Sequence, residues 1–317
     1  MVSVMLAVVS GALWMSLPFE ERDSHEVSED PSDRELPGDD SIGLEEPPPL
    51  ASDHRDPAEP ATGRPDVAVA TDPNRRYNER FAAARRLPAD LADDEIAVLL
   101  DYLNDASAFT AGSPMRERGL RNEIMNLLRS REPAVPGLAE VLAGIFADTG
   151  ADPVVRDYAL QHLGAWYPRA PQEERWLILE TLADAVAETD SSIAGTALLA
   201  LRDIRSAADE AVASDTLAGL AREIATDATN GDSARITALQ VAAESGSTEI
   251  LQTAASLALD QNEPYPLRLS AIASLRKLGG DEADEILGKV ESLQDPYLAA
   301  AFGGEMPEPE PGHGYLP

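Results

Sequence analysis

The sequence predicts an all-α fold, namely an α-solenoid of stacked antiparallel helix pairs. From Pro73 onward apolar residues recur at helical spacing, and no stretch shows the alternation of a strand. One helix motif returns three times along the chain, at intervals near 40 residues. Such intervals are typical of stacked helical repeats, in which one helix pair cannot bury its apolar stripe alone.

The motif is clearest in residues 152–164, Asp-Pro-Val-Val-Arg-Asp-Tyr-Ala-Leu-Gln-His-Leu-Gly. Asp152 suits the capping position of a helix, and Pro153 suits the first helical position because its missing N–H would have no partner there. Gly164 is the expected stop, since glycine adopts positive φ without strain. The apolar stripe of this helix consists of Val155, Ala159 and Leu163.

Copies of the motif begin at Asp190, Asp232 and Glu263. Each copy has a central alanine, and a small residue there lets a neighbouring helix approach closely. We therefore expect these alanines to be buried, at successive intervals of 38, 41 and 33 residues: Ala159, Ala197, Ala238 and Ala271. Partner helices are expected over 173–188, 211–225 and 248–259, and earlier helices over 74–86, 91–103, 118–129 and 137–146.

The stretch 152–164 resembles the second helix of a HEAT repeat, with an aspartate near the turn, Val-Arg at the helix start, then Ala and Leu. The resemblance covers residues 74–302 and implies a HEAT-like superhelix. It also implies that the arginines at the Val-Arg position bond to turn carboxylates of neighbouring repeats as a structural ladder. These are Arg156, Arg235 and Arg268, whereas Ala194 stands at this position in the copy that begins at Asp190.

Residues 1–18 contain no charged side chain and are apolar enough for a membrane segment, although a spanning helix needs about 20 apolar residues. An uncleaved anchor is favoured, because the apolar run before the small residues Ser10 and Ala12 is short for a signal peptide. A cleaved signal peptide and a buried helix of the domain are the alternatives. We expect a domain outside the cytoplasm, held at the cell membrane by one N-terminal anchor, or else a secreted or periplasmic protein.

Residues 19–72 change character, with 17 acidic and 4 basic side chains and few apolar ones. Prolines that include Pro47, Pro57 and Pro65 are expected to break any helix there. The stretch is predicted to be a disordered, acidic, Pro-rich linker. The helical repeat domain is then expected over 73–304, followed by a disordered tail over 305–317.

Composition excludes several classes of function. The chain has no cysteine, which rules out disulfides and thiolate chemistry. Its formal net charge of −32 opposes binding to nucleic acid and to an anionic membrane surface.

No constellation of catalytic or metal-binding residues stands out. The four histidines are scattered, and His162, within the clearest helix, is expected to be a hydrogen-bonded helix residue. Carboxylate pairs such as Asp93-Asp94 lie at predicted helix starts, where they complement the helix dipole. No nucleophile elbow, phosphate loop or dinucleotide motif is present. We therefore predict no catalytic residue, no cofactor and no metal.

An aromatic cluster lies between two predicted helices, at Trp166, Tyr167 and Trp176. If exposed, it would suit the anchoring of a peptide, because aromatic residues dominate interface hot spots. The alternative is that it packs a loop onto the core.

These observations predict a non-catalytic scaffold for protein–protein interaction, with a protein partner and no nucleic acid. The second helices of the repeats would present polar groups to the partner, and the candidates by helical position are Arg156, Gln161, Arg202 and Gln240. The alternatives are an enzyme of the lyase type built on a HEAT-like array and a purely structural spacer of the cell envelope.

Overall fold

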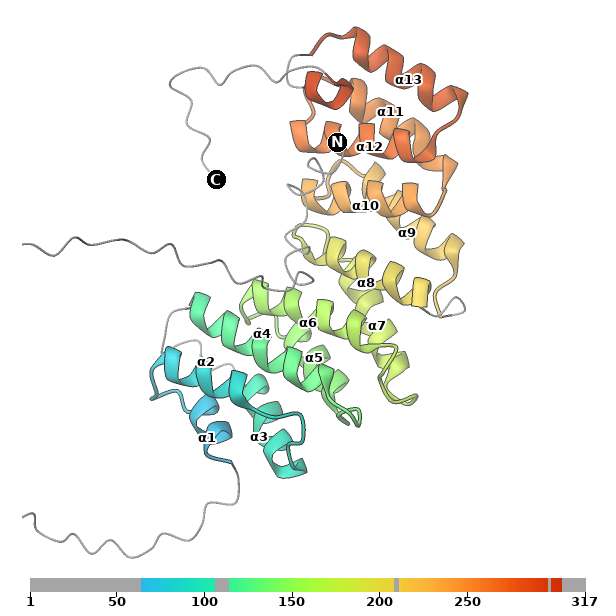
Figure 1. Cartoon of the computed structure of the whole chain (residues 1–317). Helices are drawn as coiled ribbons and strands as arrows, with labels where there is room; N and C mark the ends of the chain where they lie inside the picture. The colour runs from blue at the N-terminus through green and yellow to red at the C-terminus, as the bar shows by residue number, and fades with distance from the viewer. Residues whose placement is uncertain (1–63, 106–113, 208–210, 296–297, 304–317) are drawn as a thin grey trace, which may run out of the picture. The chain divides into compact units, whose positions relative to one another are not determined.

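The computed structural model describes residues 64–105, 114–207, 211–295 and 298–303 (Figure 1). All of them belong to one compact unit that begins at Thr62. The described residues form thirteen α-helices and two short 3₁₀ helices and contain no strand, which confirms the all-α prediction. The α-helices are α1 (Pro65–Thr71), α2 (Tyr77–Arg86), α3 (Asp93–Asn104), α4 (Pro114–Ser130), α5 (Leu138–Ala147), α6 (Pro153–Trp166), α7 (Arg175–Val186), α8 (Ile193–Ala207), α9 (Ser214–Thr226), α10 (Asp232–Glu244), α11 (Leu251–Leu259), α12 (Tyr265–Leu278) and α13 (Asp281–Ser292); the 3₁₀ helices are η3 (Thr248–Ile250) and η4 (Ala299–Phe302).

Three of the predicted segments lie partly or wholly outside these ranges. The apolar segment at 1–18, most of the acidic linker and the tail at 305–317 fall outside the described residues. Among the helices that the structure does describe, none combines the length and the apolar content needed to cross a membrane.

The helices contact one another in two rows, as can be followed in Figure 1. Each even-numbered helix touches the next even-numbered one, from α2 to α12. The odd-numbered helices α1, α3, α5 and α7 likewise touch in order, and α11 touches α13. Each even-numbered helix also packs on the odd-numbered helix that precedes it. Below, the even row is α2, α4, α6, α8, α10 and α12, and the odd row is α1, α3, α5, α7, α9, α11 and α13.

Helix α6 begins as predicted but ends later. The Asp152 carboxylate accepts a hydrogen bond of 3.0 Å from the Val154 N–H, and Pro153 is the first helical residue. Gly164 does not stop the helix, which continues to Trp166. A Cβ atom on Gly164 would lie 2.6 Å from the Cβ of Ala200, so this glycine permits close packing of α6 on α8.

Helix α1 corrects the predicted extent of the linker. It lies inside the stretch 19–72, so the helical region begins at Pro65 and not at residue 73. Pro65 occupies the first turn, where a proline removes no helical hydrogen bond. Val67 and Ala70 are buried, and α1 packs on α2. The partner helix thus covers the two apolar residues of this short helix, and the Arg80 guanidinium of α2 bonds its Ala70 carbonyl.

The core is continuous along both rows. Buried apolar side chains from Val67 to Leu298 form one contact cluster. The four motif alanines are all 0% exposed, which confirms the prediction for Ala159, Ala197, Ala238 and Ala271.

Candidate partner-binding surface

A buried arginine ties four helices of the even row to the helix before them. In each case the Nε–H donates to the backbone carbonyl ten residues earlier, near the end of the preceding odd-row helix. The distances are 3.1 Å for Arg80 to Ala70, 2.7 Å for Arg156 to Phe146, 3.5 Å for Arg235 to Ala225 and 3.4 Å for Arg268 to Ala258. The last carbonyls of a helix have no intrahelical partner and carry partial negative charge, so a guanidinium is favourable there.

All four arginines also reach a carboxylate of the next helix pair: Arg80 pairs at 3.1 Å with Glu117, within α4, and the other three pair with carboxylates in connections. Arg156 Nη2 lies 2.7 Å from Glu188 Oε1, Arg235 Nη1 lies 3.6 Å from Glu263 Oε2, and Arg268 Nη1 lies 2.5 Å from Asp295 Oδ2. The three carboxylates lie in the connections after α7, α11 and α13. The ladder that the resemblance implies is therefore present at these three positions.

Arg156 was also predicted to meet a partner, and the structure contradicts that prediction. The residue is 7% exposed, and its guanidinium donates from Nε to the Phe146 carbonyl and from Nη2 to Glu188. Its guanidinium carbon also lies 5.0 Å from the centre of the Phe146 ring. A side chain that bonds the core of the stack in this way is not available to a partner.

The ladder is interrupted at α8, as the sequence predicts. Ala194 is fully buried at the position where the other copies have arginine. Here the Gly231 N–H donates directly to the Thr189 carbonyl at 3.0 Å, which joins the connection before α10 to the one before α8. A backbone hydrogen bond thus links these neighbouring pairs.

Gln161 lies at the junction of α6 and α8. Its Nε2 donates to Asp157 Oδ2 at 2.9 Å, and Asp157 Oδ1 accepts from the Thr196 hydroxyl of α8 at 2.6 Å. All three side chains are partly exposed. Gln161 is therefore placed on the even row, with its amide oriented by a carboxylate that also holds the neighbouring helix.

Arg202 and Gln240 meet through a carboxylate that the sequence did not single out. Arg202 Nη1 of α8 donates to Glu244 Oε2 of α10 at 3.0 Å, and Gln240 Nε2 donates to Glu244 Oε1 at 3.0 Å. Arg202 also pairs with its neighbour Asp203 at 2.7 Å. The structure thus brings two of the four candidates together, and Glu244, four residues after Gln240, is the group that joins them.

The remaining even-row contacts also carry polar bonds. Between α4 and the start of α6, Arg118 Nη2 lies 2.8 Å from Asp152 Oδ2. Between α10 and α12, the Ser270 hydroxyl donates to the Ile236 carbonyl at 3.1 Å. Every junction from α4 to α12 therefore combines apolar packing with at least one side-chain hydrogen bond.

His162 belongs to the junction of α4 and α6. Its Nε2 lies 3.0 Å from Asn122 Oδ1, and the residue is 4% exposed. Burial, helped by the positive charge of Arg129, lowers the pKa of His162 to about 3, so the imidazole is neutral at physiological pH. The prediction of a hydrogen-bonded helix histidine is confirmed.

The aromatic cluster divides between the two predicted alternatives. Trp166 is 0% exposed and Tyr167 is 6% exposed, so these two rings pack the end of α6 onto the core. Trp176, at the start of α7, is 63% exposed. Of these three rings, only that of Trp176 is placed where it can contact another molecule.

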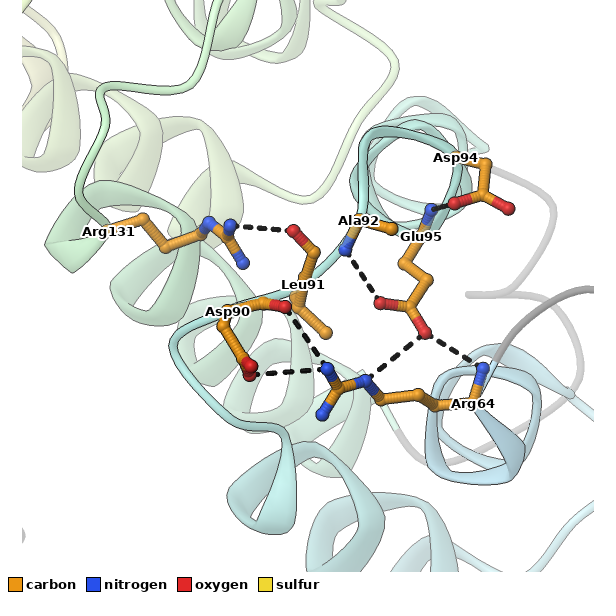
Figure 2. A network of polar contacts seen from close by, with 7 residues as sticks. All are labelled: Arg64, Asp90, Leu91, Ala92, Asp94, Glu95 and Arg131. Carbon is orange, nitrogen blue, oxygen red and sulfur yellow. Dashed lines mark hydrogen bonds and ion pairs between the residues drawn. The ribbon is translucent and has the colours of Figure 1, made fainter.

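Figure 2 shows how the N-terminal end of the odd row uses its charged side chains. Glu95 of α3 accepts hydrogen bonds of 2.8 Å from the N–H groups of Arg64 and Ala92, and these bonds, that from Ala92 above all, lower its pKa. Arg131 Nη2 donates to the Leu91 carbonyl at 2.8 Å. The carboxylate caps the first turns of α1 and α3, so this network is accounted for by the fold.

Two of the hollows on the described part of the molecule bear on the question of an active site. One of about 60 Å³ includes Leu103, Arg121 and Val155 in its lining, and one of about 320 Å³ lies between α13 and η4. The buried carboxylate of Glu117 lines neither of them, and it is bonded to Arg80 at 3.1 Å and to the Tyr102 hydroxyl. Among the described residues, no group of three or more His, Asp or Glu side chains is placed to hold a metal ion.

No protein-family model matches the chain, and neither a curated protein nor a solved structure matches it.

Proposed function

We propose that the chain is an exported, membrane-tethered, HEAT-like scaffold that binds a protein partner across the even row. In this proposal the helices stack as antiparallel pairs in an α-solenoid, and residues 1–18 provide the attachment to the membrane. The scaffold acts by surface complementarity, without catalysis, cofactor or metal, and it does not bind nucleic acid.

One observation carries the proposal. Each helix of the even row touches the next, and each junction from α4 to α12 carries a side-chain hydrogen bond. A surface of this kind, whose side chains are already oriented by their neighbours, loses little conformational entropy when a partner binds. Gln161, Arg202 and Gln240 lie on it, and Arg156 is withdrawn from the candidate set because it is buried.

The test is capture of a partner by the full chain from membrane extract, with crosslinking and mass spectrometry. We expect one protein to be recovered stoichiometrically with the wild type and lost with the double variant Gln161→Ala/Gln240→Ala. The matched control is Gln252→Ala on α11 of the odd row, an exposed glutamine that is likewise bonded to one carboxylate, at 2.8 Å from Glu282. Repeated failure to recover a stoichiometric partner, or equal loss with the control, would contradict the proposal.

The location of the domain has its own test. Protease added to intact cells should cleave an exported domain, whereas a domain that stays protected until the cells are lysed would contradict export.

A further inference from the structure

The charged side chains of the described helices are divided unequally between the two rows. The even-row helices carry 14 Arg and Lys against 7 Asp and Glu, a net charge of +7. The odd-row helices carry 3 basic and 15 acidic residues, a net charge of −12. A chain whose overall charge is −32 therefore presents one row of helices that is not acidic.

The division persists when buried groups are removed from the count. Five even-row arginines and Glu117 are buried, which leaves nine basic and six acidic side chains accessible on that row. On the odd row Glu95 is buried, which leaves three basic and fourteen acidic ones. The five buried arginines are Arg80, Arg121, Arg156, Arg235 and Arg268.

An accessible arginine of α4 stacks on an aromatic ring of α2 where the two helices pack. The rings of Tyr77 and Phe81 are half-buried, with their centres 5.5 Å apart. The guanidinium carbon of Arg116 lies 5.7 Å from the centre of the Tyr77 ring. Met115 is 77% exposed, and Arg85, whose side chain is 68% exposed, is 3.9 Å from the nearest carboxylate oxygen, that of Glu123. We call Tyr77, Phe81, Arg85, Met115 and Arg116 the α2–α4 patch.

The composition of this patch suits protein binding. Aromatic residues, methionine and arginine are enriched in interface cores, and a methionine adapts its shape to an apolar neighbour. An arginine stacked on a ring keeps N–H groups free for a carboxylate and loses little entropy when it binds one. The patch therefore combines apolar contact surface with two exposed cations, Arg116, which stacks on Tyr77, and Arg85, whose ion pair with Glu123 is long, at 3.9 Å.

We propose that the α2–α4 patch binds an acidic segment of the protein partner. An apolar side chain of the segment contacts Tyr77, Phe81 and Met115, and its carboxylates pair with Arg85 and Arg116. The proposal rests on the scaffold function and specifies the chemistry of the partner. A short acidic segment meets the patch alone, whereas a long polyanion such as nucleic acid, or a lipid surface, would also meet the carboxylates of the odd row.

The test uses the full chain and a fluorescein-labelled peptide of glutamate, serine and leucine, with fluorescence anisotropy as the measurement. The control peptide has glutamine in place of every glutamate. We expect the acidic peptide to bind more tightly than the control. The double variant Arg85→Glu/Arg116→Glu should weaken binding of the acidic peptide about tenfold or more, the range of interface hot spots. Met115→Ser, which changes an exposed side chain and leaves the charge intact, should weaken it severalfold.

The matched control is Arg276→Glu/Lys277→Glu on α12, which makes the same change in charge at two exposed even-row positions. It should change the affinity less than about twofold, because the remaining effect is long-range and screened by salt. Circular dichroism of each variant checks that the fold is kept. Equal weakening by the two double variants, equal binding of the glutamine peptide, or displacement by duplex DNA or anionic vesicles as effective as by unlabelled peptide would overturn the proposal.

The outcomes separate this proposal from the scaffold function. If the acidic peptide does not bind while the full chain still captures a partner in a manner that depends on Gln161 and Gln240, the acidic-segment proposal fails and the scaffold stands. If no partner is ever captured, the scaffold fails, whatever the peptide does.

Discussion

Arg156 of α6 and Glu188, in the connection after α7, lie 2.7 Å apart although 32 residues separate them in the chain. The same guanidinium bonds the Phe146 carbonyl near the end of α5 at 2.7 Å. One side chain thus joins two successive helix pairs. Arg268 makes the corresponding contacts at α12, to Ala258 and Asp295.

We expect Arg156→Met to lower the free energy of unfolding by about 2–3 kcal/mol. The main loss is the hydrogen bond to a buried helix-end carbonyl, since an unsatisfied buried acceptor costs roughly 1–3 kcal/mol. The ion pair adds less, because the Glu188 side chain is 38% exposed and partly screened. Urea denaturation is the measurement. Arg202→Ala, which removes a more exposed pair, should cost less than about 1 kcal/mol, and an equal cost in the two variants would refute the special role of Arg156.

Gly164→Ala should destabilise the protein even though alanine is the better helix former. The new Cβ would lie 2.6 Å from the Cβ of Ala200, and overpacking of this kind costs about 1–3 kcal/mol. Gly288→Ala in α13 is the matched control, because the added methyl group has no atom within 4 Å beyond its chain neighbours and its own helix backbone. It should stabilise by roughly 0.5–1 kcal/mol. Thermal denaturation of the two variants should therefore give shifts of opposite sign, and shifts of the same sign would argue against close packing of α6 on α8.

His162 should make stability depend on pH below neutrality. Burial lowers its pKa from 6.5 to about 3, so the unfolded chain takes up a proton in this range that the native protein does not. The free energy of unfolding therefore carries the full contribution of neutral His162 above pH 6.5, and this contribution is lost as the pH falls toward 3. Between pH 7.5 and pH 5 the wild type should lose about 2 kcal/mol more than His162→Gln, which keeps a donor for Asn122. Identical pH profiles from urea titrations would show that His162 is not held neutral.

Most helix positions could be predicted because periodicity and end signals are local. Asp152 and Pro153 mark the start of α6, and the motif alanines mark the buried faces of the helices. The prediction that Gly164 ends the helix is wrong because the role of this glycine depends on Ala200, which is distant in sequence. The sequence does not predict helix α1, because its two buried residues, Val67 and Ala70, are recognised as a buried face only once α2 is seen to cover them.

The candidate surface was harder to predict than the fold. Helical position places Gln161, Arg202 and Gln240 on the even row, where the structure has them, but it does not distinguish them from Arg156, whose length lets it reach back to Phe146. The bridging role of Glu244 depends on the register between α8 and α10, and that register is set by packing. The division of charge between the rows is readable from the sequence once the alternation of helices is known.

The central claim is that neighbouring even-row helices lie side by side in one stack, and a disulfide tests it most directly. The chain has no cysteine, so the double variant Gly195→Cys/Thr237→Cys would carry the only two thiols. A Cβ on Gly195 of α8 would lie 3.1 Å from the Cβ of Thr237 of α10, which needs only a small shift to reach disulfide geometry. Mild oxidation of the native protein should give a monomer that migrates faster on a non-reducing gel, whereas Gly195→Cys/Gln252→Cys should not. Failure of the first pair to crosslink within one chain, or equally fast crosslinking of the second, would contradict the stack.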